Sequence, residues 1–173
     1  MNITWTIYES PFGPLALVGG PRGLTRLYFP GHAGAMNEES RDPKPFAEAV
    51  AQLNEYFAGR RRRFELDLDL QGTPFQQSVW AQLAAIPHGE TRAYGELARA
   101  IGRPDRARAV GAAVGRTPVP IIVPCHRAVG ATGELTGYLG GLPLKRALLD
   151  LEASVSGGQP LPAVLAGRQL SLT

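Results

Sequence analysis

The sequence predicts an α/β protein of the α+β kind, with a small mixed α/β domain at the N-terminus and a mostly helical domain after it. In the first thirty residues, short apolar stretches alternate with Pro/Gly turns, which is typical of short β-strands. From residue 73 onward the chain is rich in alanine, and its apolar residues recur at helical spacing. A break at Gln71-Gly72 separates the two patterns. We therefore expect one domain over residues 1–70, a second over 71–153, and a flexible tail over 154–173.

The N-terminal domain is predicted to combine strands with one helix. The first strands are expected at residues 4–8, 15–18 and 24–29. An amphipathic helix that stops at Gly59 is indicated by apolar residues at helical spacing, namely Phe46, Val50, Leu53 and Phe57. Between residues 64 and 70, apolar residues alternate with acidic ones, which predicts a half-buried strand.

The second domain is predicted to begin with a helix at Thr73-Pro74, with the threonine as N-cap and the proline in the first helical position. A short helix over 94–101 follows, and Pro104-Asp105 is expected to open another that runs to about residue 115. Two short helices joined by a Gly-containing turn are typical of a helix-turn-helix. An ordinary helical hairpin fits this pattern equally well.

The segment after this helix pair is the most distinctive part of the chain. The apolar run at residues 121–123 predicts a buried extended piece, which leads into Pro124-Cys125-His126-Arg127. A Gly-rich active-site loop over 130–141 then connects to a final helix near 143–152. The sequence beyond residue 153 shows no convincing periodicity.

Composition and charge leave several kinds of partner open. The chain has 173 residues, with 18 Lys+Arg against 15 Asp+Glu, a net charge of +3 and a pI near 9.3. A polyanion is therefore a plausible partner, but the excess of positive charge is small. The basic residues are nearly all arginine, which favours phosphate and base contacts but would equally follow from a GC-rich genome.

The sequence gives no indication of a metal, a cofactor or a membrane segment. A single cysteine and three histidines offer no spacing for a structural zinc, so we expect neither metal nor cofactor. No apolar run approaches the length of a membrane span, and the first residues lack the pattern of a signal peptide. We therefore expect no membrane contact and a cytoplasmic location.

Cys125 is the residue best suited to act as a nucleophile. A free thiol has a pKa of about 8.5 and needs a base or a positive field to become a nucleophile at neutral pH. His126 is adjacent and Arg127 follows. From spacing alone, however, a lone buried cysteine is more often a small hydrophobic core residue, so both interpretations stay open at this point.

The helix over 108–115 carries little side-chain bulk apart from Arg108 at its start. It lacks the Asn, Gln or Lys side chains that would read base edges in the major groove, but a thin helix fits the minor groove, which is about 6 Å wide. Tight packing against the protein core would also require small residues, and the pattern does not decide between these two interpretations.

These motifs together resemble one known family. Pro124-Cys125-His126-Arg127, the upstream Arg108-Ala109-Val110-Gly111, and the downstream Leu135-Thr136-Gly137-Tyr138 with Gly140-Gly141 are similar to the methylated-DNA–protein-cysteine methyltransferases, or 6-O-alkylguanine-DNA alkyltransferases. The resemblance is strong from about Thr73 to Glu152, and the N-terminal part resembles the family's variable first domain. The order of these motifs favours Cys125 as a nucleophile.

The resemblance implies a catalytic set of three residues. Cys125 matches the acceptor nucleophile, and His126 matches the base that takes its proton, through a water in family members. Glu152 matches the carboxylate that orients the histidine, so that the three form a triad-like relay.

The resemblance also implies a set of binding residues. Tyr94 matches the residue beside the flipped guanine and its 3′ phosphate, and Arg108 matches the finger that fills the vacated stack. Tyr138 matches an aromatic pocket wall, with Pro120 and Val114 on neighbouring walls, while Arg127 and Lys145 match polar groups around the site. The remaining expected contacts to substrate or DNA are Ala109, Gly111, Ala112, Thr117 and Leu139.

The activity implied by the resemblance is DNA repair by direct alkyl transfer. A methyl or other alkyl group would pass from the 6-oxygen of guanine, with the 4-oxygen of thymine as a further candidate, to Cys125. The partner would be duplex DNA bound through its minor groove, with the damaged base flipped out. Because the product thioether is stable, we expect one turnover per molecule, and a monomer with no required protein partner.

Two positions depart from the family pattern. Family members usually carry Asn where this chain has Thr117, and the shorter hydroxyl is expected to make only part of the bridge between the recognition helix and the active-site segment. The predicted consequence is a functional but slower or less stable protein. Leu139 occupies a position that is often Gly or Ser in relatives, and we expect its side chain to narrow access for bulky alkyl groups.

Three other functions are alternatives to this one. A non-catalytic relative that only binds alkylated DNA would lack the cysteine. A helix-turn-helix regulator would need base-reading side chains on its second helix, and a cysteine hydrolase would turn over without consuming its thiol.

Overall fold

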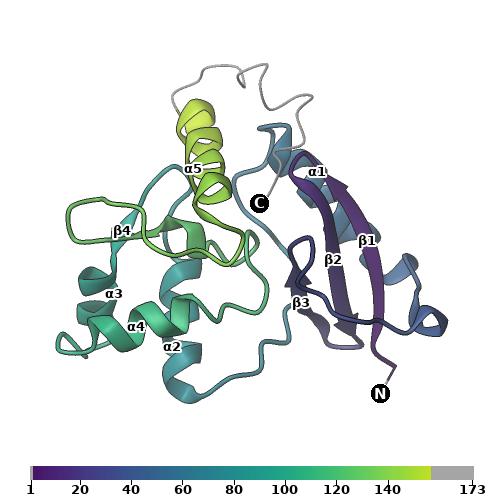
Figure 1. The fold of residues 1–173 in the computed structure, drawn as a ribbon, viewed down its shortest axis with the longest axis horizontal. Helices are drawn as coiled ribbons and strands as arrows, with labels where there is room; N and C mark the ends of the chain where they lie inside the picture. Colours follow the sequence, from purple (N-terminus) through teal and green to yellow (C-terminus); the bar gives the residue numbers. More distant parts are fainter. Residues whose placement is uncertain (1, 157–173) are drawn as a thin grey trace.

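A computed structural model describes residues 2–156 of the chain, and the predicted mixed α/β class is confirmed. A sheet with one helix and a group of helices lie side by side, with α5 at the boundary between them (Figure 1). The strands are β1 (Thr4–Ser10), β2 (Gly13–Gly20), β3 (Gly23–Tyr28), β4 (Arg92–Ala93) and β5 (Ala128–Val129). The α-helices are α1 (Ala47–Phe57), α2 (Pro74–Ala84), α3 (Tyr94–Ala100), α4 (Ala107–Val114) and α5 (Leu142–Ser156). Single 3₁₀ turns occur at Glu38–Ser40, Lys44–Phe46 and Cys125–Arg127.

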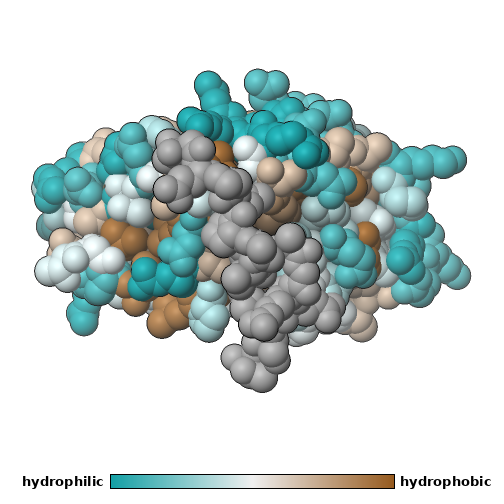
Figure 2. Space-filling model, turned by 90° about the horizontal axis from the view of Figure 1, so that it is seen from above, coloured by the Kyte–Doolittle hydropathy of each residue, from teal (hydrophilic) through white to brown (hydrophobic). Residues whose placement is uncertain are grey.

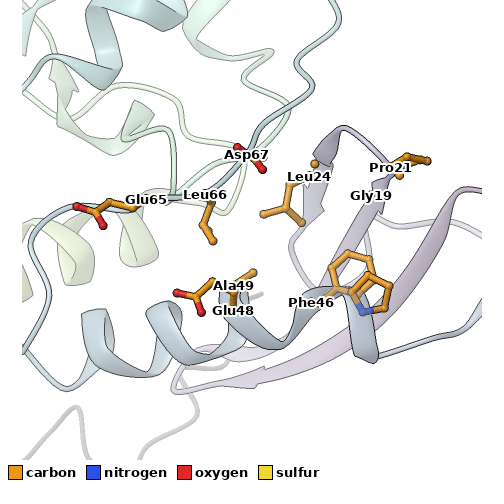
Figure 3. A pocket seen from close by; sticks show the side chains of 12 residues that line it. Gly19, Pro21, Leu24, Phe46, Glu48, Ala49, Glu65, Leu66 and Asp67 are labelled. Carbon is orange, nitrogen blue, oxygen red and sulfur yellow. The ribbon is translucent and has the colours of Figure 1, made fainter.

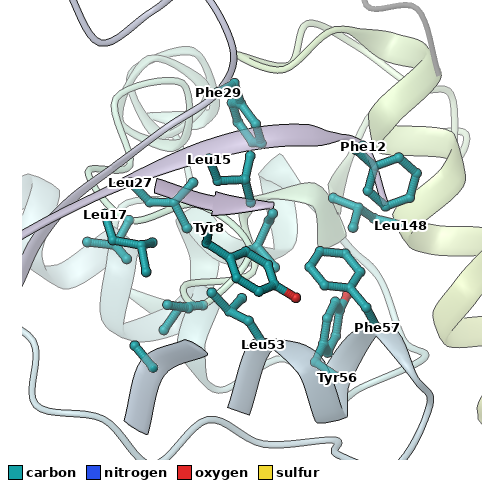
Figure 4. Packing of buried hydrophobic residues seen from close by; sticks show 14 of the residues in the cluster. Tyr8, Phe12, Leu15, Leu17, Leu27, Phe29, Leu53, Tyr56, Phe57 and Leu148 are labelled. Carbon is teal, nitrogen blue, oxygen red and sulfur yellow. The ribbon is translucent and has the colours of Figure 1, made fainter. Parts of the chain in front are cut away.

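The three strands predicted in the N-terminal part are present, and they form an antiparallel sheet in the order β1-β2-β3. Apolar side chains from the strands face α1, and Leu148 of α5 joins the same cluster (Figure 4). The cluster also contains Ile121 and Ile122, which lie far along the chain. The core of the N-terminal unit is therefore completed by residues of the C-terminal part.

The C-terminal helices form a second core around Val79, Trp80, Leu83 and Val110. Helix α2 begins at the predicted cap: the Thr73 side chain accepts from the Gln76 backbone N–H at 3.2 Å, and the Gln76 side chain accepts from the Thr73 N–H at 2.9 Å. The helix pair α3 and α4 packs onto this core, with turns at residues 101–106 between the two helices.

The active-site segment lies between the two cores. Ile121 and Ile122 belong to the N-terminal cluster, whereas Val123 and Cys125 belong to the helical one. Every residue from 117 to 130 is buried. The position of Cys125 is therefore fixed by packing on both sides rather than by the segment alone.

The predicted strand over residues 64–70 is wrong, although its alternation of half-buried and exposed side chains is largely present. The segment makes one isolated bridge, between Leu24 and Leu68. Its only backbone bonds to β3 are Leu24 N–H to Asp67 O and Asp69 N–H to Leu24 O. Further along β3, the Leu27 N–H donates to Pro118 O at 2.9 Å, so the edge that a fourth strand would need is already occupied.

Two predicted boundaries are corrected. Helix α4 begins at Ala107 rather than at Pro104, because residues 103–106 form a turn closed by the Arg106 N–H on Arg103 O at 2.9 Å. Proline suits the second position of such a turn as well as the start of a helix. At the C-terminus, α5 continues to Ser156, beyond the predicted end near Glu152. Residues 157–173, most of the predicted tail, lie outside the described residues.

The predicted extended piece at 121–123 is buried but not extended. Ile121 has φ of 73°, a left-handed conformation that is rare for a β-branched residue. The Val123 N–H donates to Val119 O at 2.9 Å and closes a tight reversal just before Cys125. Burial of Ile121 in the N-terminal core offsets the cost of this backbone strain.

The outer surface is mixed in character. Seen from the end at which α5 finishes, hydrophobic side chains form only small patches between hydrophilic ones (Figure 2). Among the described residues, no helix has both the length and the apolar character needed to cross a membrane.

Candidate active site

Cys125 begins a single 3₁₀ turn and is 3% exposed. Its backbone N–H donates to Val123 O at 2.7 Å. Burial raises the pKa of the thiol to about 11, although the hydroxyls of Thr117 and Tyr138 and the charge of Lys145 act in the opposite direction. The cysteine therefore rests as a protonated thiol and needs a base to become nucleophilic.

His126 lies in the same turn and is fully buried. Its Nε2 is 2.7 Å from Oε1 of Glu152 in α5. Burial lowers the pKa of His126, and this outweighs the opposing effect of Glu152, so the ring is neutral. A neutral ring that donates from Nε2 carries its lone pair on Nδ1, and Nδ1 has no hydrogen-bond partner among the described residues.

Glu152 is the centre of the buried polar network. Arg127 donates to its two carboxylate oxygens, from Nε at 2.9 Å and from a terminal nitrogen at 2.8 Å. The Gly89 N–H donates to Oε2 at 3.3 Å, and the Tyr56 hydroxyl donates to Oε1 at 2.7 Å. Burial alone would raise the pKa of Glu152, but the hydrogen bonds from His126 and Arg127, together with the charge of Arg127, outweigh it and hold the pKa well below its usual range. The carboxylate is therefore charged and held from several sides.

The side chains around the thiol come from separate elements. Thr117, just after α4, donates from its hydroxyl to Val114 O at 2.7 Å. The Tyr138 hydroxyl is buried beside Cys125 but makes no hydrogen bond of regular geometry with any described residue. Lys145 of α5 is buried, and its ammonium group donates to Thr136 O at 3.1 Å.

Tyr94 reaches this region because two short strands pair over a long sequence distance. Strand β4 pairs in parallel with β5, which follows Arg127 directly. The pairing places Tyr94, the first residue of α3, beside the Gly-rich loop, where its hydroxyl lies 2.8 Å from Oγ1 of Thr136. The ammonium group of Lys145 lies 6.0 Å from the centre of the Tyr94 ring.

Helix α4 buries one face and exposes the other. Val110, Ala113 and Val114 pack into the helical core, where the Trp80 indole N–H donates to Ala113 O at 3.0 Å. The outward positions are Arg108 and Ala112, which are exposed, with Ala109 and Gly111 half-buried. The small residues of this helix thus serve two roles: the alanine at 113 packs inside, while those at 109, 111 and 112 are turned toward the surface.

The space beside the thiol is very small. A cavity of about 10 Å³ is lined by Val114, Gly115, Thr117, Pro120, Cys125, Gly137, Tyr138 and Leu139. This is about the volume that one water molecule needs. Leu139 lies at the rim and is 44% exposed. A ligand larger than water therefore requires part of this lining to move.

Larger cavities occur elsewhere. One of about 420 Å³ lies between the β2–β3 hairpin, the start of α1 and residues 65–67 (Figure 3). Its lining combines apolar side chains such as Leu24 and Phe46 with the carboxylates of Glu48, Glu65 and Asp67. It shares no lining residue with the cavity at Cys125. Among the described residues, no cluster of His, Cys, Asp and Glu is arranged to hold a metal ion.

The structure brings most of the sequence-predicted residues into one region and adds two. Cys125, His126, Arg127 and Glu152 form one connected set, with Thr117, Tyr138 and Leu139 around the thiol. Tyr94 borders this set, whereas the outward residues of α4 form a separate surface. Tyr56 and Gly89 touch Glu152 directly and were not predicted. A tyrosine in an amphipathic helix and a glycine in a loop give no sequence signal of such a role.

A buried thiol with a neutral histidine and a charged carboxylate, next to a surface helix of small residues, defines a class of proteins that act through a cysteine nucleophile. Comparison with known proteins narrows this class. Residues 74–154 match the domain described as "6-O-methylguanine DNA methyltransferase, DNA binding domain", and residues 3–70 match the "ribonuclease-like domain" of the same family. The chain therefore belongs to the 6-O-methylguanine DNA methyltransferase family.

Individual relatives agree with this assignment. A methylated-DNA–protein-cysteine methyltransferase of Mycobacterium tuberculosis is 52% identical over 154 residues, covering 88% of this chain and 93% of the relative. One of Methanosarcina acetivorans is 48% identical over 155 residues, covering 87% and 98%. Among solved structures, the M. tuberculosis OGT in complex with DNA has a TM-score of 0.85 at 49% identity, covering 95% of this chain and 99% of that one.

Proposed function

We propose that this protein repairs DNA by transferring a methyl or other alkyl group from the 6-oxygen of guanine to the sulfur of Cys125, once per molecule. The observation that carries the proposal is the buried Cys125 beside a neutral His126 whose Nε2–H is held by Glu152 at 2.7 Å. The names of the relatives agree with it, because they describe a protein cysteine as the methyl acceptor.

The geometry supports a specific route for the thiol proton. Because the His126 Nε2–H is held by Glu152, the lone pair of Nδ1 is left to accept the proton of Cys125. The charged Glu152 then stabilises the imidazolium. The thiolate attacks the alkyl carbon, a C–S bond forms and the C–O bond breaks. The bonding electrons stay on guanine, which takes up one proton in place of the one lost by the thiol.

The thioether product explains the single turnover. A C–S bond is not opened by a histidine–carboxylate pair, and Cys125 is the only cysteine in the chain. No cofactor enters this chemistry, because the alkyl carbon is itself the electrophile. The protein is thus consumed as a reagent.

The depth of Cys125 requires the damaged base to leave the helix stack, at a cost of a few kcal/mol. Duplex DNA is proposed to lie against the outward face of α4 through its minor groove, with Arg108 near the vacated stack. The packing of the protein itself does not demand a glycine at 111, since an added Cβ would meet only Tyr94, at 3.9 Å. A close external partner is a better reason for a small residue there. The proposed binding unit is a monomer.

The substrate pocket would be formed by Thr117, Pro120, Tyr138 and Leu139 around the thiol. Its present volume of about 10 Å³ cannot accept a base. Binding is therefore proposed to displace the loop at 137–139, with Leu139 limiting the size of the alkyl group.

The test is the intact mass of the protein after mixing with excess duplex that contains 6-O-methylguanine, followed by peptide mapping. A gain of one methylene on Cys125, absent from Cys125→Ala, is expected. Tight binding without any gain in mass would reject alkyl transfer and favour a protein that only binds the damage. Turnover of an ester with no gain in mass would instead indicate a hydrolase.

A further inference from the structure

Tyr56 connects the N-terminal unit to the centre of the active site. It lies in α1, is 1% exposed, and donates its hydroxyl proton to Oε1 of Glu152 at 2.7 Å across 96 positions of sequence. Among the described residues, it is the only side chain of the N-terminal sheet and α1 for which a hydrogen bond to Glu152, His126 or Arg127 is found.

The ring of Tyr56 is held so that the hydroxyl has little freedom. Phe57 packs edge-on at 5.2 Å between ring centres, and Phe64 packs at 5.3 Å. The ring of His88, from the loop that also supplies the Gly89 N–H, packs edge-on at 6.1 Å. A buried tyrosine needs a partner for its hydroxyl, but that partner need not be a catalytic group. Tyr8 in the same core satisfies its hydroxyl on Asn54 at 2.9 Å.

We propose that Tyr56 is a positioning residue for the alkyl transfer, which sets both the orientation and the charge density of Glu152 and thereby controls the proton affinity of His126. This inference rests on the proposed function and deepens it. It makes the N-terminal unit a contributor to the reaction rather than only a support for the fold.

The physical basis is the sharing of one oxygen. Oε1 of Glu152 accepts hydrogen bonds from Tyr56, His126 and Arg127. Each donor withdraws part of its negative charge. Without the Tyr56 hydroxyl, more of that charge would face the His126 Nε2–H, the imidazolium would be better stabilised, and the pKa of His126 would rise. Since only the neutral ring can take the thiol proton, the reaction would then need a higher pH.

Other titratable groups also act on His126. Cys125 and Arg127 belong to its own turn, and Lys145 and Glu152 reach it from α5. His88 acts on it from the loop after α2, and Arg62 acts in turn on His88. Tyr138 of the Gly-rich loop acts on Cys125 and Glu152 beside it. A Tyr56→Phe change leaves all of these in place, so a shift in the pH dependence would report the missing hydroxyl.

The experiment compares Tyr56→Phe with Tyr8→Phe in the full chain. Single-turnover rate constants for methyl transfer from duplex containing 6-O-methylguanine are measured between about pH 5 and pH 9, well below both melting temperatures. The two variants lose one hydroxyl each from the same core, and among the described residues no hydrogen bond joins Tyr8 to Glu152, His126 or Arg127. For Tyr56→Phe we expect the acid limb of the rate profile to move to higher pH and the rate near neutrality to fall roughly three- to tenfold. In Tyr8→Phe, the acid limb should stay at the same pH as in the wild type.

A second measurement follows the protonation of His126 directly. The chain has only three histidines, so nitrogen NMR of labelled protein can follow each imidazole as the pH changes. The pKa of His126 should be higher in Tyr56→Phe than in wild type. The same spectra show whether the variant is folded.

An unchanged rate profile and an unchanged His126 titration in folded Tyr56→Phe would overturn the positioning role. Failure of the proposed function looks different, because the wild-type protein itself would then take up no methyl group. A change shared equally by Tyr8→Phe would reduce Tyr56 to an ordinary core residue.

Discussion

Cys125 illustrates how burial determines chemistry at the level of a single residue. Burial raises the pKa of the thiol to about 11, so the free protein presents little thiolate to oxidants or to alkylating agents in solution. In the proposed reaction, the lone pair of His126 Nδ1 and the charge of Glu152 act when a substrate carbon lies beside the sulfur. The burial that keeps the thiol protonated also keeps the proposed base neutral.

The first prediction at the scale of single residues concerns the hydroxyl of Thr117. Thr117→Val keeps the shape but removes the hydroxyl that donates to Val114 O and lowers the pKa of Cys125. Because the Thr117 backbone N–H still donates to Val114 O, we expect a loss of only about 1 kcal/mol, or a melting temperature lower by roughly 2–4 °C. The transfer rate should also fall, because the thiol becomes harder to ionise.

The reverse substitution tests the departure from the family pattern. Thr117→Asn supplies both a donor and an acceptor and should raise the rate or the melting temperature. If neither quantity changes, the threonine is an adequate replacement and the hypothesis is wrong. Calorimetry and single-turnover assays provide the two measurements.

Leu139 is the second prediction at this scale. Leu139→Ser should speed transfer of a benzyl group by roughly tenfold relative to methyl, because it removes a side chain from the rim of the small cavity. Leu142→Ser is the matched control, since Leu142 is equally exposed, at 44%, but does not line the cavity. If the ratio of the benzyl to the methyl transfer rate is the same in the two variants, Leu139 does not limit the size of the alkyl group.

At the scale of elements, α4 shows how one short helix serves two surfaces. Val110, Ala113 and Val114 fix it to the helical core, while Arg108 and Ala112 face outward. Its lack of bulk is therefore only partly explained by packing. The small residues on the outward face are explained by the proposed contact with the minor groove.

Ala112→Leu tests this face. The side chain is exposed, so the free energy of unfolding should change by less than about 0.5 kcal/mol. Affinity for duplex DNA should nevertheless fall, because a long side chain cannot enter a groove about 6 Å wide. Ala51→Leu, on the exposed face of α1, is the control, and fluorescence anisotropy with labelled duplex gives both affinities. Equal affinities would place the DNA elsewhere.

On the scale of the whole molecule, the buried network at Glu152 joins parts that are distant in sequence. Tyr56 comes from the N-terminal unit, Gly89 from the loop after α2, and His126 and Arg127 from the active-site turn. Because these hydrogen bonds form only in the folded state, folding stability should depend on the charges at this site.

The pH dependence of stability follows from the shifted pKa values. Burial lowers the pKa of His126 below its usual 6.5, so below about that pH the unfolded chain binds a proton that the native chain does not. The free energy of unfolding should therefore fall as the pH drops through and below 6.5. Glu152, whose pKa is held well below 4.5, adds a further loss below that pH.

His126→Gln isolates the histidine contribution. It removes one titrating group while His88, whose pKa burial also lowers, remains. Denaturant unfolding between about pH 7.5 and pH 5 should show a smaller loss of stability in the variant than in wild type. Parallel curves would mean that His126 takes up its proton at the same pH in the native and the unfolded chain, contrary to the lowered pKa.

Local signals in the sequence were sufficient for the elements that depend on neighbouring residues. The cap at Thr73, the first strands and the helix over 47–57 follow from side-chain spacing and turn residues, and the structure confirms them. The motif around Cys125 likewise indicates the family. These features are local because the hydrogen bonds and apolar faces that form them lie within a few residues of one another.

Only the tertiary structure decided the features that depend on long-range packing. The segment 64–70 forms no strand because Pro118 occupies part of the edge of β3. Ile121 adopts a left-handed conformation where the chain passes from one core to the other: Ile121 packs in the N-terminal core, and Val123 packs in the helical core. Tyr56 donates a hydrogen bond to Glu152 across 96 positions of sequence, and no pattern of residue spacing can reveal such a contact. By itself, the sequence indicated which residues are proposed to carry the chemistry, whereas packing between distant segments determined their ionisation and their partners, because burial and hydrogen bonding are properties of the assembled core.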